Sequence, residues 1–331
     1  SSAASDVYKR QKQLTQQDVN QLMMMHQNGQ YKQAITEANK LIKDFPNELL
    51  LFNILGVCLE QEGEFKKAAD AYRSALKINP SIPELQFNLG AMLFALSEPE
   101  KAISFYKEAI RLNANFTEAY FNLGILFQSQ SKFDDAIKYY EKALKIQPGF
   151  YEAITNIGSI KQLQGDLNQA IKLFKQSLNL KKDAKGHYNI AGAYRNQGNL
   201  ALAIEHLRKA VELGKQEPKF YSDLGDALWH DGQIAEAKEF LSLAVKIDPS
   251  HPRANYQFAI FLYDNKEFKE AIKYFDQSHT EDWQERSLYC LYKLKQFDKF
   301  KEKLLPLIKS KNNSPFLATL STHYAQNFQV P

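Results

Sequence analysis

Apolar and polar residues alternate with a helical period along most of the chain, in paired stretches joined by short polar connectors such as QEGEF and QGDLN. The tetrapeptide FNLG stands at 87–90 and again at 121–124, a shift of 34 residues that also aligns the flanking pattern. Each repeat predicts a helix, a turn and a second helix. The repeats lie at 15–48, 49–82, 83–116, 117–150, 151–183, 184–217, 218–251 and 252–280.

Small residues recur at two fixed places in each repeat. Position 20 is alanine in all eight repeats, and position 8 is glycine or alanine in repeats two to eight, as at Gly90 and Ala191. Two helices that cross closely need small residues at the crossing. Position 24 is usually aromatic, and a proline at position 32, such as Pro80, ends the second helix. Antiparallel helix pairs are therefore expected throughout.

This pattern resembles the tetratricopeptide repeat, in which Gly or Ala at 8, Ala at 20, an aromatic at 24, Ala at 27 and Pro at 32 recur. The resemblance covers residues 15 to 280. It implies an all-α fold, a right-handed α-solenoid of antiparallel helix pairs with no sheet. It also implies that the first helices line a concave wall through positions 2, 5, 6, 9, 12 and 13.

Both ends of the chain depart from the eight repeats, which we assign to residues 12–280. Residues 1–11, SSAASDVYKRQ, resemble translated sequencing-adapter DNA at the edge of a metagenomic fragment, and we expect them to be a disordered artefact outside the fold. Residues 281–314 predict a degenerate helical pair, because Leu288 and Phe300 stand where small residues are expected. Residues 315–331 are expected to begin a further helix or a downstream domain.

Charge and cysteine usage indicate no nucleic-acid, membrane or disulfide-rich class. The 42 Lys+Arg and 38 Asp+Glu are interspersed, and no apolar run is long enough to span a membrane. Cys58 and Cys290 are far apart, without metal spacing. We expect a cytoplasmic protein.

The sequence holds no phosphate loop, zinc-protease helix or nucleophile elbow, and its seven histidines are scattered. No catalytic residue, metal or cofactor is predicted for this chain.

Short polar residues occupy position 6 of six consecutive repeats: Asn88, Asn122, Asn156, Asn189, Asp223 and Gln257. An amide both donates and accepts, so a ladder of them can pair with the backbone of an extended peptide whatever its side chains. Similar asparagine ladders line the superhelix of O-linked N-acetylglucosamine transferases. The alternative is that neutral polar residues simply face solvent, and the sequence leaves both interpretations open.

Position 2 changes sign along the chain, from Glu84, Glu118 and Glu152 to Lys185, Lys219 and Arg253. Glutamate in a first turn complements the helix dipole, which accounts for the acidic half alone. The basic half favours a groove with two electrostatic characters. The two-residue basic clamp of co-chaperone tetratricopeptide domains is not matched, so no chaperone-tail binding is expected.

The function predicted from these residues is a protein-interaction scaffold that binds an extended protein or peptide segment in its concave groove. The alternative is the substrate-targeting region of a larger enzyme. Residues 287–308 and 314–328 resemble the junction in bacterial tetratricopeptide proteins that continue into a 2-oxoglutarate- and iron-dependent oxygenase; a glycosyltransferase is the less favoured continuation. RNA binding is disfavoured, because glutamates stand where phosphates need Lys or Arg. The sequence leaves the oligomeric state open.

Overall fold

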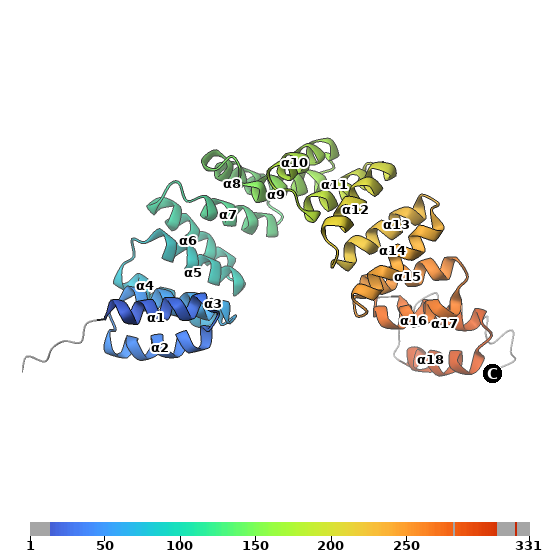
Figure 1. The fold of residues 1–331 in the computed structure, drawn as a ribbon, viewed down its shortest axis with the longest axis horizontal. Coiled ribbons are helices and arrows are strands. Elements are labelled where there is room, and N and C mark those ends of the chain that lie inside the picture. Colours follow the sequence, from blue (N-terminus) through green and yellow to red (C-terminus); the bar gives the residue numbers. More distant parts are fainter. Residues whose placement is uncertain (1–13, 281, 310–321, 323–331) are drawn as a thin grey trace, which may run out of the picture. The chain divides into compact units, whose positions relative to one another are not determined.

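The computed structural model describes residues 14–280, 282–309 and 322, and in that part of the chain all regular structure is helical. Figure 1 shows the helices in chain order, and each helix packs against the next from α1 to α8 and again from α10 to α18. Their bounds are α1 Gln16–Gln27, α2 Tyr31–Asp44, α3 Leu49–Gln61, α4 Phe65–Ile78, α5 Pro83–Ala95, α6 Pro99–Leu112, α7 Thr117–Ser129, α8 Phe133–Ile146, α9 Tyr151–Leu163, α10 Leu167–Leu180, α11 Ala184–Asn196, α12 Leu200–Leu213, α13 Pro218–His230, α14 Ile234–Ile247, α15 Pro252–Asp264, α16 Phe268–Ser278, α17 Trp283–Lys293 and α18 Phe297–Lys309.

The fold class predicted from the sequence is confirmed: each of the eight frames holds one helix pair. The chain divides into two compact units, residues 1–157 and 158–331, with the division inside α9. Each unit has its own apolar core. Leu22, Leu51 and Tyr72 belong to the core of the first unit, and Leu224, Leu241 and Phe275 to that of the second.

The turn inside a helix pair needs one residue in the left-handed conformation. Gly63 supplies it with φ of 74°, and Ser97 does so in the third repeat with φ of 60°. Pro99 stands at position 17 of the third repeat, where the other repeats have a large apolar residue. It takes the first position of α6, where a missing N–H costs no hydrogen bond, and the connector closes as its counterparts do.

The close crossing inside a pair explains the glycine at position 8. A Cβ added to Gly90 would lie 2.9 Å from the ring of Tyr106, and one added to Gly158 would lie 2.8 Å from Phe174. Both rings are buried at position 24 of the same repeat. The large ring on the second helix therefore requires glycine, which has no side chain, at the facing position of the first helix.

The last described pair, α17 and α18, replaces this arrangement with larger side chains. Leu288 and Phe300, which stand at the positions that are small elsewhere, are fully buried and form a separate cluster with Leu291 and Leu304. Residues 1–11 lie outside the described part of the chain, as do residues 315–331 apart from Thr322.

Candidate peptide-binding surface

The first helices carry the asparagines of position 6, and two of these side chains are bonded to the repeat before. Asn122 Nδ2 donates to the hydroxyl of Tyr106 over 3.3 Å, and Asn156 Nδ2 donates to that of Tyr140 over 3.1 Å. Burial raises the pKa of each tyrosine to about 12, so both hydroxyls stay protonated at neutral pH. Each bond occupies one amide N–H, and the other N–H and the carbonyl oxygen of that side chain remain available to a ligand.

Asn88 and Asn189 are partly exposed and make no side-chain hydrogen bond to another described residue. The residue at position 24 of the preceding repeat explains the difference. Tyr72, opposite Asn88, has its hydroxyl directed to Glu60 Oε2 at 3.2 Å instead. Phe174, opposite Asn189, has no hydroxyl. These two amides keep both their donors and their acceptor.

The position-6 side chains of Asp223 and Gln257 do not offer a full set of free hydrogen-bonding groups at the surface as Asn88 and Asn189 do. Asp223 is 1% exposed, and its carboxylate accepts from the Tyr188 hydroxyl and, over 3.0 Å, from Arg253 Nη2. The side-chain oxygen of Gln257 is buried and has no hydrogen-bond partner among the described residues. The expected polar positions exist, but here they are turned inward.

The position-2 residues also differ in their surroundings. Glu84, Glu118 and Lys185 are exposed, and Glu152 is partly exposed. The Lys219 ammonium lies 4.6 Å from the centroid of the Tyr188 ring. Lys219, Arg253 and Asp223 therefore meet around Tyr188, a residue at position 5 that sequence reasoning did not single out.

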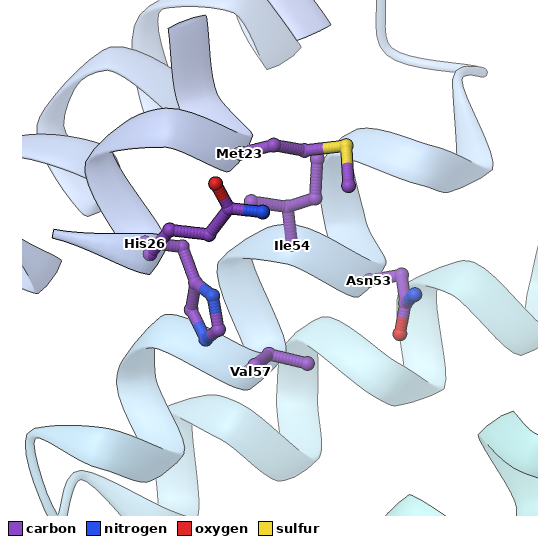
Figure 2. Close-up of a pocket in the computed structure, with 6 residues that line it drawn as sticks. Met23, His26, Asn53, Ile54 and Val57 are labelled. Atoms are coloured by element: carbon purple, nitrogen blue, oxygen red, sulfur yellow. The ribbon is translucent and has the colours of Figure 1, made fainter. Parts of the chain in front are cut away.

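The first unit contains a pocket that the sequence reasoning also missed. Figure 2 shows side chains from α1 and α3 around it, and its volume is about 120 Å³. Its lining belongs to the concave positions 5, 6, 9, 12 and 13 of repeats one and two: Met23, His26, Gln27, Asn53, Ile54 and Val57. The pocket is mostly apolar, with a polar rim that carries no ionised carboxylate or amine.

The described residues offer neither a metal-binding cluster nor a reactive thiol. They contain no group of three or more His, Cys, Asp or Glu side chains arranged to hold a metal ion. Cys58 and Cys290 are both buried, and burial raises the pKa of the Cys290 thiol to about 12, which suppresses the reactive thiolate. None of the described helices is both long and apolar enough to cross a membrane.

Comparison with known proteins agrees with this geometry. An 81-residue stretch, 24% of the chain, is 35% identical to bacteriophage adsorption protein A of Escherichia coli strain K12, and it spans 8% of that protein. The C-terminal part of a TPR repeat-containing protein from Cytophaga hutchinsonii has a similar fold, with TM-score 0.58 and 19% identity over 71% of this chain and 97% of that one. The APC/C hetero-tetramer Cut9-Hcn1 also gives a TM-score of 0.58, at 18% identity over 75% of this chain and 49% of the other.

Family models identify the repeats directly. Models described as tetratricopeptide repeat match residues 27–83, 117–150, 151–216, 194–255 and 228–282, and one described as TPR repeat matches 91–131. The matched ranges together cover residues 27–83 and 91–282, which is most of the chain. The chain belongs to the tetratricopeptide repeat family.

Proposed function

We propose that this chain is a protein-interaction scaffold whose first helices hold an extended peptide segment through its backbone. The observation that supports this most is the state of the position-6 asparagines. Asn88 and Asn189 keep all their hydrogen-bonding groups, and Asn122 and Asn156 keep a carbonyl oxygen and one N–H. All four are partly exposed on first helices.

The tyrosine bonds make two of these amides better receptors. A side chain that is already held in one rotamer loses less conformational entropy when a ligand binds. Asn122 and Asn156 are anchored in this way, and their remaining groups can pair with a peptide N–H and C=O. Backbone pairing of this kind predicts broad sequence tolerance along the ladder.

Nucleic acid is a poorer partner for the same surface. Glu84 and Glu118 are exposed near the start of α5 and α7, where they would repel phosphate groups. No ion pair of either glutamate with a described residue neutralises its charge. A protein segment, whose backbone is neutral, meets no such penalty.

The experiment is a selection of random peptides on the full chain, followed by affinity measurement of the selected peptides on variants. Asn88→Ala with Asn189→Ala removes the two amides that have no role in packing, and should weaken binding roughly two- to tenfold per amide. The matched control is Asn39→Ala with Asn179→Ala, two exposed asparagines on the second helices α2 and α10. Equal losses in both double variants would contradict the proposal.

A further inference from the structure

The second unit contains two cationic side chains held in place by residues that are themselves fixed. Arg253 donates to Asp223 at 3.0 Å, and the Asp223 side chain is 2% exposed while that of Arg253 is 50% exposed. One edge of the guanidinium is thus anchored in the interior, and the rest faces solvent. An arginine has five N–H donors, so most remain for a ligand.

Lys219 is positioned by the same network, through the ring of Tyr188. Its ammonium lies 4.6 Å from the centroid of the Tyr188 ring, and the Tyr188 hydroxyl donates to Asp223. No described carboxylate forms an ion pair with Lys219, and the side chain is only partly exposed. The ring attracts the cation without neutralising its charge.

A structural role alone accounts poorly for this arrangement. Burying a carboxylate beside an arginine is at best weakly stabilising, because desolvation offsets much of the attraction. Lys219 is outside that ion pair altogether. What the four residues achieve together is to hold two positive groups with restricted rotamers on first-helix positions, α13 and α15.

We propose that Lys219 and Arg253 form a receptor for a side-chain carboxylate of an acidic peptide, with Asp223 and Tyr188 as its positioning residues. The inference rests on the proposed function and adds the chemistry of the partner: Asp or Glu in the segment that lies on the second unit. Charge complementarity selects a carboxylate, and the guanidinium fork can bind it through two parallel hydrogen bonds.

The test measures the anisotropy of a fluorescein-labelled decapeptide of alternating glutamate and serine, titrated with the full chain at low ionic strength. A lysine–serine decapeptide serves as the opposite probe and should bind more weakly. Lys219→Gln should weaken binding of the acidic probe about tenfold. Lys246→Gln on α14 makes the same charge change at an exposed site and should leave the affinity within about twofold. Equal losses in the two variants, or none in Lys219→Gln, would overturn the proposal.

The variant Asp223→Asn distinguishes the anchoring of Arg253 by Asp223 from a general attraction between the positive chain and the acidic probe. The substitution makes the chain more positive, so non-specific attraction predicts tighter binding of the acidic probe, whereas loss of the Arg253 anchor predicts weaker binding. Tighter binding would overturn the receptor. If circular dichroism shows that this variant does not fold, Arg253→Lys decides, since it keeps the charge opposite Asp223 and loses the fork: an unchanged affinity would overturn the proposal.

The two proposals can fail separately. Loss of library-peptide binding in the Asn88 and Asn189 variant, with no effect of Lys219→Gln on the acidic probe, would retain the scaffold and reject the carboxylate receptor. If Lys219→Gln weakens binding of the acidic probe while the Asn88 and Asn189 variant binds the library peptides normally, the carboxylate receptor is retained and the backbone ladder is rejected.

Discussion

The side-chain amide of Asn122 donates a hydrogen bond to the hydroxyl of Tyr106 across 3.3 Å, and so joins position 6 of one repeat to position 24 of the repeat before it. The Tyr106 side chain is fully buried, and no other hydrogen bond of its hydroxyl is present among the described residues. The asparagine therefore serves packing between repeats as well as the candidate surface.

Asn122→Ala should lower the free energy of unfolding by about 1–3 kcal/mol, because it leaves a buried hydroxyl unsatisfied. Asn189→Ala, opposite Phe174, should change it by less than about 0.5 kcal/mol. Urea unfolding followed by circular dichroism measures both. Adding Tyr106→Phe to Asn122→Ala removes both partners and should restore most of the loss. A double variant as unstable as Asn122→Ala would show that the hydrogen bond is not the cause.

The close crossing of α5 and α6 predicts that alanine substitutions at two glycines change stability in opposite directions. Gly90→Ala places a methyl group 2.9 Å from the Tyr106 ring, and should destabilise the chain by about 1–3 kcal/mol through overpacking. Gly192→Ala in α11 meets nothing nearer than Gln162 Nε2 at 3.6 Å and should stabilise by about 0.5–1 kcal/mol through helix propensity. Thermal unfolding of the two variants compares them, and two shifts of the same sign would refute the packing argument.

The pH dependence of stability should follow a histidine pair between α11 and α12. His187 Nδ1 and His206 Nδ1 lie 3.1 Å apart. Burial and the nearby His187 lower the pKa of His206 to about 4, and burial and Lys209 lower that of His187, while Glu205 opposes both shifts. A base whose pKa falls on folding binds fewer protons in the folded state. Stability should therefore be constant above about pH 6.5 and decline as the pH falls towards about 4.

The measurement is the midpoint of urea unfolding across that pH range, with His206→Gln as the comparison. The variant has lost one titrating partner, so its curve should decline less between about pH 6.5 and 4. His230, an exposed histidine bonded to the Asp226 carbonyl, supplies the control, and His230→Gln should keep the steeper decline of the wild type. Identical slopes for the wild type and His206→Gln would contradict the assignment.

The sequence predicted the helices well because the signals that end them are local. Pro83 and Pro252 begin helices at the frame boundaries, and Gly63 and Gly165 close the connectors. The site was predicted less completely. Position 6 looked like one class of residue, and the structure separates it into amides bonded to a tyrosine and amides that are not.

That separation depends on residues 16 positions away, such as Tyr106 for Asn122, which become neighbours only when repeats stack. The network around Asp223 has the same origin, because Tyr188 and Arg253 lie 35 and 30 residues from it. Periodicity places such residues on a common face. It does not determine which rotamer each adopts, or whether a carboxylate turns inward to meet a neighbour.

The most direct test of the account is a double-mutant cycle between the chain and a selected peptide whose backbone N–H groups are methylated. Methylation removes peptide donors and leaves every side chain intact. It should weaken binding to the wild type at least about fivefold, and much less to the variant with Asn88→Ala and Asn189→Ala, since those acceptors are already absent. Equal losses on both proteins would contradict backbone recognition by the asparagines.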